Sequence, residues 1–574
     1  MSTFIADFET TTDKDDCRVW AWALCEVGNE SNLIIGNNID DFMSWCSNKS
    51  ENHVVLFHNL KFDAQFIMVW LFNNGFIHTT EQFDRQTKTF NTSINEKGLY
   101  YQVEVIFRRN GKRINKVTFQ DSLKLIPLAV EEMPGALGIP YQKLTIDYKK
   151  HREIGHELTE EEKAYITNDV KIVAKAVEFF YSQGLNKMTI GACAMADYKA
   201  MIKEKNFGRY FPSPQYDWDV RQSYYGGWTY LNPLFASKTL GRGIVLDINS
   251  IYSAVMYEEL LPYGTPIYFE GQYQQDSHYP LYVQMLRCQF ELKEGKLPTV
   301  QLRRRGRANE YLTSSNNEQV TLCLTNTDLE LFFENYDVYC IEYTSGWKFK
   351  GTTGLFKEYI EKWYGEKVQA DKEGNKGKRF IAKSYLNSLY GKFGTLPKQK
   401  TKIPYMNKKG VISFKDSVPV RREGVYIAMA SFITSLARKR ILTAAQKIQD
   451  DYHAGKSNIQ FVYADTDSLH LISPDGTLPE CLEIDNLKMG AFKFEGEFRK
   501  AKFLRQKCYI EELSKPHKED YHLKITVAGM PETCYQYVNF NNFKIGATYK
   551  GKLEPERVPG GVVLKSIDYT IKKV

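Results

Sequence analysis

The sequence lacks cysteine pairs of the kind that mark disulfide frameworks or metal sites. Its ten cysteines are scattered through 574 residues, with no Cys-x-x-Cys motif and no other metal-ligand spacing. This usage is typical of a reduced, intracellular protein in which cysteine serves as a small core residue.

Long apolar runs are also missing, and we find no secretory signal. The longest apolar stretch, Val425 to Ala437, contains Ser431, Thr434 and Ser435 and is too short to cross a bilayer. We therefore expect no membrane partner. With 43% hydrophobic and 14% aromatic residues the chain is not disordered, and its length indicates several domains.

Positive charge is scarce in the first third of the chain and abundant in the rest. Residues 1–180 contain 20 Lys plus Arg against 26 Asp plus Glu, a net charge of −6, whereas the remainder has 56 against 43, a net of +13. The asymmetry predicts an acidic module joined to a basic body that faces a polyanion. Charge that only solubilises both parts is the alternative.

Two clusters of cations favour a nucleic acid as that polyanion. FRKAKFLRQKCY (498–509) interleaves five cations with Phe498, Phe503 and Tyr509, and LRRRGR (302–307) contains four arginines. Cations of this density bind phosphates, and aromatic side chains between them can stack on bases. For either cluster alone, a solvated helix face is the alternative.

The acidic module carries its acids at regular spacings. STFIADFETTT predicts a strand on which Asp7 and Glu9 point to one face. A second strand-like run, residues 53–66, ends in a predicted polar turn carrying Asn59 and Asp63.

A helix predicted over residues 159–180 adds a fourth acid. Thr159 and Glu162 form a capping-box pattern at its start, and Tyr165 and Asp169 follow as neighbours on one face. Four convergent carboxylates could neutralise two divalent cations, as metal-assisted phosphodiester hydrolysis requires. Each acid taken singly is more often a cap or a surface residue, so only the ordered set is informative.

The basic body contains a second set of acids within apolar, strand-like runs. Asp247 ends such a run in GIVLDINSIYSAVMY (243–257), and FVYADTDSLHLI has the pattern of a hairpin whose turn carries Asp465 and Asp467. Burial of unpaired carboxylates is costly. If the two strands are adjacent, shared Mg²⁺ ions explain this burial and provide the arrangement that in-line displacement at phosphorus needs.

A helix predicted at 379–394, ending near Gly391, adds a cation and an aromatic ring. Lys383, Asn387 and Tyr390 lie on one face at helical spacing, and Lys362 and Lys367 precede them on or near a partner helix. Lys383 can meet a triphosphate, and Tyr390 offers a flat surface to a base.

In this order and spacing, the acids of the first module resemble the DxE, Nx(2–3)(F/Y)D and Yx3D motifs of the 3′–5′ exonuclease domain of DNA polymerases. The resemblance implies that Asp7, Glu9, Asp63 and Asp169 hold metal ions, and that Tyr165 orients the attacking water. It places Lys143 where the family has a lysine that assists hydrolysis. It also implies a path for the single-stranded 3′ end lined by Thr10, Asn59, Phe62, Ser122 and Leu123.

The second set resembles family B DNA polymerases across nearly the whole chain. DINSIY, KSYLNSLYG and YADTDS occur in the order of motifs A, B and C, Lys507-Cys508-Tyr509 matches the KxY motif, and Tyr224-Tyr225-Gly226-Gly227 matches the Yx(G/A)G-type linker. The compact size, CRVWAWA near the start and PGGVVL near the end resemble the protein-primed polymerases of small phages. Motif A departs from the family pattern at Ile251 and Ser253, which replace Leu and Pro; we expect a looser turn after Tyr252.

The resemblance implies a role for each matched residue. Asp247 and Asp467 would bind the catalytic metals, with Asp465 supporting the site. Lys367 and Lys383 would contact the triphosphate, with Lys362 and Asn387 nearby. The remaining roles are exclusion of ribonucleotides by Tyr252, packing on the nascent base pair by Tyr390, contact with the primer terminus by Lys507 and Tyr509, and contact with the template by Tyr224, Gly226 and Gly227.

The implied fold is α/β and α+β: a ribonuclease H-like exonuclease domain, then a right-hand polymerase of palm, fingers and thumb with two insertions, called TPR1 and TPR2. The predicted domains are exonuclease 1–187, palm 188–258, TPR1 259–354, fingers 355–394, TPR2 395–426, palm 427–535 and thumb 536–574.

The implied function is protein-primed replication of a phage genome, processive and with strand displacement, by a monomer in the cytoplasm of the infected bacterium. Its cofactor would be Mg²⁺ or Mn²⁺, and its partners primer-template DNA, dNTPs and a terminal protein. Three alternatives remain: an exonuclease whose polymerase module only binds DNA, an RNA-synthesising enzyme, and a structural DNA-binding protein. Tyr252 argues against the second, and the ordered acids argue against the third.

Overall fold

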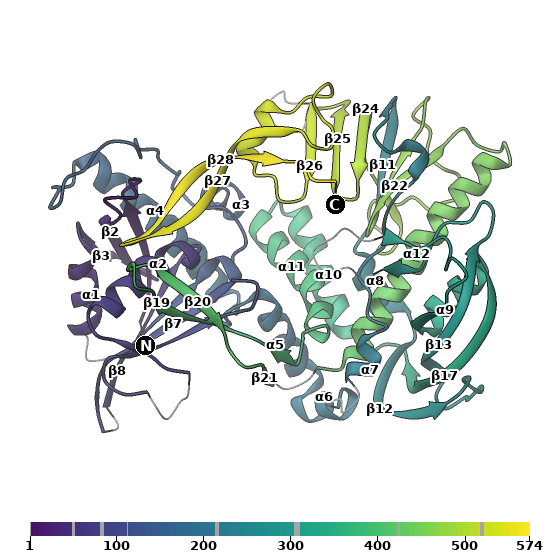
Figure 1. Cartoon of the computed structure of the whole chain (residues 1–574), viewed down its shortest axis with the longest axis horizontal. Coiled ribbons are helices and arrows are strands. Elements are labelled where there is room, and N and C mark those ends of the chain that lie inside the picture. Colours follow the sequence, from purple (N-terminus) through teal and green to yellow (C-terminus); the bar gives the residue numbers. More distant parts are fainter. Residues whose placement is uncertain are drawn as a thin grey trace.

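The computed structural model describes residues 2–48, 52–80, 85–111, 113–212, 217–302, 310–421, 425–516 and 522–573. An N-terminal α/β module lies beside a larger body built around a second sheet, and a long hairpin near the C-terminus spans the two (Figure 1). No helix within these ranges is long and apolar enough to cross a membrane.

The N-terminal module is an eight-stranded mixed sheet in the order β3-β2-β1-β4-β8-β7-β6-β5. The central strands β1, β4 and β8 run parallel, while β2 pairs antiparallel with β1 and β3 pairs antiparallel with β2. The bounds are β1 (Thr3–Thr10), β2 (Val19–Glu26), β3 (Asn29–Gly36), β4 (His53–Phe57), β5 (Ile77–His78), β6 (Thr89–Ile94), β7 (Tyr100–Asn110) and β8 (Arg113–Asp121).

Helices cover this sheet because its strands are apolar on both faces. The central strands β1 and β2 are mostly buried along their length. The helices are α1 (Ile39–Asn48), α2 (Leu60–Asn73), the 3₁₀ turn η1 (Ser122–Lys124), α3 (Met133–Leu137) and α4 (Glu160–Ser182). The start of α4 has the predicted capping box: Thr159 accepts a hydrogen bond from the Glu162 backbone N–H at 3.2 Å, and the Glu162 carboxylate accepts one from Thr159 N–H at 3.1 Å.

The larger body has an antiparallel sheet in the order β26-β25-β24-β11-β23-β22-β9, with β10 paired to β24. The long helix α12 (Ile427–His453) packs against β22 and β23, and its first half is almost entirely buried. The strands are β9 (Thr229–Leu231), β10 (Thr239–Leu240), β11 (Gly243–Ile248), β22 (Gln460–Asp465), β23 (Ser468–Ile472), β24 (Phe492–Arg505), β25 (Cys508–Leu513) and β26 (Leu523–Val527).

Short helices join the two sheets and flank the second. They are α5 (Ile190–Ile202), α6 (Glu204–Tyr210), α7 (Asp217–Arg221), η2 (Pro233–Phe235) and α8 (Ile251–Glu258). Two helices packed on each other, α10 (Lys357–Lys372) and α11 (Lys376–Phe393), stand beside them. The sequence predicted that α11 ends near Gly391; it continues to Phe393, because Gly391 is tolerated inside the last turn and Gly394 follows as the C-cap.

The described residues between 259 and 354 form a four-stranded sheet, a two-stranded sheet and a helix. The four-stranded sheet has the order β12 (Leu261–Glu270), β17 (Tyr336–Thr352), β13 (Leu281–Leu292) and β16 (Val320–Thr325); the two-stranded sheet pairs β14 (Gln301–Leu302) with β15 (Glu310–Tyr311), and the helix is α9 (Asn326–Asn335). Of the Arg-rich cluster at 302–307, residues 303–307 lie outside the described residues, so its role stays a prediction.

Two hairpins reach the N-terminal module from elsewhere in the chain. One, residues 398–421, consists of β18 (Lys398–Gln399), β19 (Lys402–Met406), β20 (Ile412–Asp416) and β21 (Val420–Arg421). The other follows the 3₁₀ turn η3 (Glu532–Tyr537) and consists of β27 (Thr548–Val558) and β28 (Gly561–Thr570). Figure 1 shows both lying against the N-terminal module.

The two hairpins meet the N-terminal module in a packed core. Val558, Val562 and Val563 share one apolar cluster with Phe66 of α2 and Ile412 of β20. A Cβ on Gly561 would lie 2.3 Å from the Phe66 ring, so only glycine permits this approach. The hairpins at residues 398–421 and 548–570 therefore pack on the N-terminal module, although they are far from it in the sequence.

Candidate active sites

The first candidate site gathers acids from one strand and two helices of the N-terminal module. Asp7 and Glu9 lie on β1, Asp63 on α2 and Asp169 on α4. Their charges interact with one another across the three elements. The structure therefore brings together the four acids that the sequence motifs predicted.

One local prediction about this site was wrong. Asp63 lies in the first turn of helix α2 and is buried, whereas the sequence suggested a polar turn. Residues 60–73 are apolar on all sides of the helix, so the segment shows no helical periodicity in its hydrophobic pattern. Only Asn59, with a left-handed φ of 77°, belongs to the turn.

Burial favours the protonated form of the carboxylates of this site. Burial, followed by the charge of Asp169, raises the pKa of Asp7 to about 7. Burial, followed by the charge of Asp7, raises the pKa of Glu9 and of Asp63 well above their usual values, and burial raises the pKa of Asp169. Burial and the charges of neighbouring acids both destabilise a carboxylate anion. A bound cation would offset both effects.

Two phenols and a lysine border these acids. Lys143 Nζ lies 3.7 Å from the Asp169 carboxylate. The Tyr165 hydroxyl lies 2.7 Å from that of Tyr148, and burial raises the pKa of Tyr165, so its hydroxyl stays protonated. Tyr148 was not singled out from the sequence, because a single exposed tyrosine in a loop carries no pattern.

A buried carboxylate organises the predicted path of the 3′ end. Asp121 accepts hydrogen bonds from the backbone N–H groups of Asn59 (3.0 Å) and Leu123 (3.1 Å), and pairs with Lys124 at 2.8 Å. The Ser122 hydroxyl donates to the Phe57 carbonyl at 3.1 Å. Asp121 therefore fixes two of the predicted DNA ligands, a role that only the fold reveals.

The other two residues of this path lie at element ends. Thr10 is the last residue of β1, after a bulge at Glu9, and Phe62 lies in the first turn of α2 with its ring 5.7 Å from that of Phe66. Both lie next to acids of the site, and their contact with the 3′ end stays a prediction.

The donor set fits a hard divalent cation. Its ligand atoms are carboxylate oxygens, which Mg²⁺ and Mn²⁺ prefer. Asp169 Oδ1 is buried with no hydrogen-bond partner among the described residues. Within the described ranges, no group of three or more His, Cys, Asp or Glu side chains is arranged to hold a metal ion.

The second candidate site lies where two strands of the larger sheet end side by side. β11 pairs with β23, with Asp247 opposite Ser468, and Asp467 precedes that residue in the turn after β22. The Asp467 carbonyl accepts a hydrogen bond from the Ile248 N–H at 2.7 Å. The strands are therefore adjacent, as the expected metal arrangement requires.

Electrostatics again favour a cation at these acids. Burial, followed by the charge of Asp467, raises the pKa of Asp247 to about 7, and burial raises the pKa of Asp467. Glu495 on β24 contributes to the shift at Asp247, and we did not single it out from the sequence. It belongs to an alternating strand pattern, in which an acid facing the site is indistinguishable from a solvated one.

Asp465 has a cationic partner. Lys507 Nζ lies 2.7 Å from its carboxylate, and the Lys507 backbone N–H donates to the Tyr463 hydroxyl at 2.9 Å. Tyr509 is buried, with its ring 5.4 Å from that of Tyr463. The KxY residues are thus anchored beside the acid turn.

The basic run at 498–509 corrects a sequence interpretation. It forms most of β24, a turn and the start of β25, and neither a helix face nor a set of stacking platforms. Phe498, Phe503 and Tyr509 are at most 5% exposed, so they cannot stack on bases. The three rings lie in the core and the five cations are half-buried or exposed; register shifts between Phe498 and Lys500 and between Phe503 and Arg505 interrupt the simple alternation of the strand.

Lysines of the helical pair face the acids. Lys383 on α11 is close enough to lower the pKa of both Asp247 and Asp467 against the effect of burial. Lys367 on α10 donates to Asn249 Oδ1 (3.2 Å) and Ser250 Oγ (3.3 Å) of the turn after β11. Burial, followed by neighbouring cations, lowers the pKa of Lys367 to about 8.

Other predicted nucleotide ligands divide into two groups. The rings of Tyr252 and Tyr390 stack with centroids 4.0 Å apart at 22°. Asn387 is exposed on α11, one helical turn after Lys383. Lys362 pairs with Asp197 of α5 at 3.0 Å.

Motif A does not contain the loose turn that we expected after Tyr252. Tyr252 and Ser253 lie in the first turn of α8, after Ser250 at φ 56°. Ser253 is 1% exposed, and its hydroxyl has no hydrogen-bond partner in the described part of the chain. A residue other than Pro is compatible with a helix at this position, so the start of α8 stays ordered.

The Tyr224–Gly227 linker abuts the acid turn. A Cβ on Gly227 would lie 2.6 Å from Thr466 Cγ2, whereas one on Gly226 would meet nothing within 4 Å. The Trp228 carbonyl accepts from the Thr466 N–H at 2.9 Å. The Tyr224 hydroxyl approaches Gly394 at the end of α11, so the linker joins the acid turn to the helical pair.

Comparisons with known proteins identify the family. The model of DNA polymerase type B, organellar and viral, matches residues 45–157 and 142–476. The DNA polymerase of Bacillus phage phi29 is 41% identical over 99% of both chains. Two solved structures, phi29 DNA polymerase complexed with primer-template DNA and incoming nucleotide substrates and the same polymerase complexed with single-stranded DNA, cover 100% of both chains at 40% identity with TM-scores of 0.92 and 0.91.

The chain belongs to the type B DNA polymerases. It is a DNA-directed DNA polymerase with an exonuclease domain, in the multidomain α/β and α+β fold predicted from the motifs. The domain limits and the roles of individual residues stay predictions of the sequence.

Within this polymerase, one further residue ties the linker to the core. Arg438 of α12 donates to the carbonyls of Tyr225 (2.8 Å) and Gly226 (2.9 Å) and pairs with Asp328 of α9 at 2.6 Å. Nothing in the sequence distinguished it from the other cations of a long helix.

Proposed function

We propose that this polymerase replicates a phage genome by protein-primed initiation, processively and with strand displacement, and proofreads with its exonuclease site. The observation that carries the proposal is the presence of two separate sets of buried or half-buried acids on two modules of one chain. Hydrolysis and nucleotidyl transfer each need such a set.

Asp247 and Asp467 would hold two divalent cations in the palm, supported by Asp465, and Asp7, Glu9, Asp63 and Asp169 would hold two in the exonuclease domain. Bound Mg²⁺ or Mn²⁺ would polarise the reacting phosphate and favour deprotonation of the attacking oxygen.

The side chains around the palm acids would position the nucleotide. Lys383 and Lys367 would bind the triphosphate, and the stacked Tyr252 and Tyr390 would form the floor beneath sugar and base. Tyr252 would exclude a 2′-hydroxyl by contact. Lys507, now paired with Asp465, would turn to the primer terminus.

In the exonuclease domain, Tyr165 would orient the attacking water through a hydroxyl that burial keeps protonated. Lys143, beside Asp169, would stabilise the charge that develops on the scissile phosphate. Asn59, Phe62, Ser122, Leu123 and Thr10 would hold the single-stranded end.

Packing of the β27–β28 tip on α2 and β20 supports the processive part of the proposal. We propose that this packing closes the protein into a ring around the DNA. Such a ring would slow dissociation, so product length should be insensitive to excess trap DNA. Products that shorten to a few nucleotides in the trap would contradict the ring.

Protein priming rests on the resemblance to phage polymerases that start on a hydroxyl of a terminal protein. We propose that protein as the priming partner, the infected bacterium as the site of action, and a monomer as the working form. Initiation products covalently attached to that protein are the expected signature; synthesis only from a nucleic-acid primer would contradict it.

The deciding experiment is extension of a labelled primer-template with Mg²⁺, with and without dNTPs. Extension with dNTPs and degradation without them is the expected result. Degradation alone, unaltered by Asp467→Ala, would leave the second candidate, an exonuclease with an inactive DNA-binding polymerase module.

A further inference from the structure

A basic cavity lies where the N-terminal module meets the two hairpins that pack on it. It has a volume of about 480 Å³ and is lined by Lys61 of α2, Lys97 of the β6–β7 turn, Lys402 of β19 and Arg557 of β27, over Tyr100 and Phe414. These residues come from the N-terminal module and from the two hairpins that reach it, which Figure 1 shows converging beside α2.

The lining of this cavity contains four cations and no acid among the described residues. Lys402 pairs with Asp416 at 2.6 Å, and that acid does not line the cavity. In the described parts of the chain, Lys61, Lys97 and Arg557 form no ion pair with a carboxylate. Cations gathered without countercharges repel one another and attract anions.

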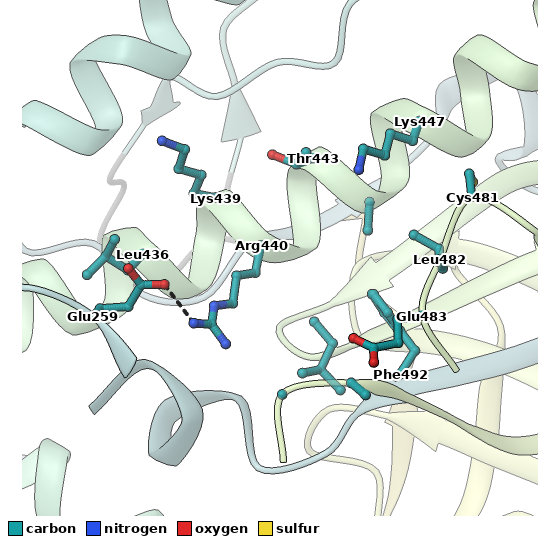
Figure 2. A pocket seen from close by; sticks show the side chains of 14 residues that line it. Glu259, Leu436, Lys439, Arg440, Thr443, Lys447, Cys481, Leu482, Glu483 and Phe492 are labelled. Atoms are coloured by element: carbon teal, nitrogen blue, oxygen red, sulfur yellow. Dashed lines mark hydrogen bonds and ion pairs between the residues drawn. The ribbon is translucent and has the colours of Figure 1, made fainter. Parts of the chain in front are cut away.

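A second cavity, on the opposite side of the molecule, shows that such a lining is not a general feature of this basic protein. That cavity, of about 510 Å³, borders α12 and has Lys439, Arg440 and Lys447 in its lining (Figure 2). Glu259 and Glu483 line it too, and Arg440 pairs with Glu259 at 2.6 Å. Acids within its own walls offset its cations, so it does not call for an anion.

The floor of the basic cavity indicates phosphate and not a base as the bound group. Tyr100 is 2% exposed, and the Arg557 guanidinium lies over the Phe414 ring, 4.7 Å from its centroid. Neither aromatic ring of the floor therefore offers a free face for stacking. The planar guanidinium above the floor and the long lysine side chains match phosphate oxygens.

We propose that this cavity binds backbone phosphate of single-stranded DNA, and that the bound phosphate holds the two hairpins against the N-terminal module. The inference rests on the proposed function, since it presumes DNA as the substrate. Lys61, which lines the cavity, precedes Phe62, a predicted ligand of the single-stranded 3′ end, in the first turn of α2; this neighbour favours a single strand over a duplex as the occupant.

The test is binding of fluorescein-labelled oligothymidylate to the full chain in EDTA, at several salt concentrations. For Lys97→Gln with Arg557→Gln we expect an affinity lower by about 5- to 10-fold at low salt. We also expect the slope of log K against log salt to shrink by about 0.7 for each phosphate that the variant no longer neutralises.

Matched controls separate the cavity from charge in general. Lys408→Gln with Lys409→Gln removes the same charge from the exposed turn of the β19–β20 hairpin, and Lys447→Gln removes a cation of the second cavity. Affinity and slope of both should stay within about twofold of the parent. A cavity variant indistinguishable from these controls would overturn the proposal.

An uncharged methylphosphonate in place of one phosphate of the oligonucleotide distinguishes direct contact between the cavity and that phosphate from an indirect effect of the substitutions on hairpin packing. Oligothymidylates with one methylphosphonate at successive positions should bind the parent more weakly at one or two positions, and the cavity variant should be indifferent at those positions. If each methylphosphonate weakens binding by the same factor in the parent and in the cavity variant, at every position, the four cations do not contact a particular phosphate. That result would refute the phosphate site.

Two probes identify which strand is bound: a primer-template with a long template overhang, and a duplex with an unpaired 3′ tail. Loss of affinity confined to the first assigns the template strand, and loss confined to the second assigns the primer end. No loss with either would point to a ligand other than DNA and refute the proposal. A chain that binds these probes but neither extends nor degrades them would refute the proposed function and leave this site standing.

Discussion

The exonuclease acids and the palm acids differ in what surrounds them. In the exonuclease domain four carboxylates lie close to a lysine, Lys143, at 3.7 Å from Asp169. In the palm, Lys383 and Lys507 are close enough to lower the pKa of Asp467, and Lys367 lies against the turn after β11. Among the described residues named here, the palm acids therefore have more lysines around them than the exonuclease acids do.

The two sites also differ in how they are assembled. The exonuclease acids come from three elements, the first and last separated by more than 100 residues, held by helix packing on a sheet. The palm acids sit at the ends of hydrogen-bonded neighbouring strands. Backbone pairing therefore fixes the palm acids, and side-chain packing fixes the exonuclease acids.

The largest expected effect is a complete separation of the two activities. Asp467→Ala should reduce primer extension by about 10³-fold or more and leave degradation within about twofold, because a metal-binding carboxylate is lost at one site only. Asp7→Ala should do the reverse. The measurement is the rate of extension and of degradation on one labelled substrate; parallel loss of both activities in either variant would mean that the sites are not independent.

Gly227→Ala should slow nucleotide incorporation at the palm and leave exonuclease degradation unchanged. The added methyl would lie 2.6 Å from Thr466 Cγ2 and displace the turn between Asp465 and Asp467, so single-nucleotide incorporation should slow by about 30-fold. Gly241→Ala, at a glycine with open space and no predicted DNA contact, is the matched control. Adding Thr466→Gly to Gly227→Ala should restore the rate; failure to restore it would exclude the clash as the cause.

Lys367 should make dNTP use sensitive to pH. Its pKa is lowered to about 8, so the ammonium is present below pH 8 and is lost as the pH rises through that value. We expect kcat/KM for dNTP to fall by about 10-fold between about pH 7 and 9, since this parameter reports the free enzyme. Lys367→Arg keeps its charge and should flatten that profile; an equally steep profile in this variant would assign the pH dependence elsewhere.

The smallest predicted effect concerns Tyr148 and the exonuclease alone. Tyr148→Phe removes the hydroxyl 2.7 Å from that of Tyr165, and degradation of single-stranded DNA should slow by about 3-fold. Tyr141→Phe, in the same loop, loses a hydrogen bond to Glu30 away from the acids and is the control. Equal rates for both variants would show that the Tyr148 hydroxyl does not orient Tyr165.

The motifs located the acids of both sites because metal chemistry demands carboxylates at fixed spacings on strands and helices. The same reasoning failed for the neighbours. Glu495, Tyr148 and Asp121 carry no periodic signal, and each reaches its site only through pairing or packing of distant segments. Lys362 was predicted from its position near Lys367 to bind the nucleotide, which stays a prediction; only the fold shows that it pairs with Asp197 of another helix.

By itself, the sequence determined which residues could hold metal and that a basic body follows an acidic module. Carboxylate spacing, capping patterns and charge are local properties, and they can be read without knowledge of the fold. Only the tertiary structure decided that the 498–509 aromatic side chains face the core, that Asp63 starts a helix, and that Lys61, Lys97, Lys402 and Arg557 meet in one cavity. Those outcomes depend on packing between segments far apart in the chain, and no local pattern encodes them.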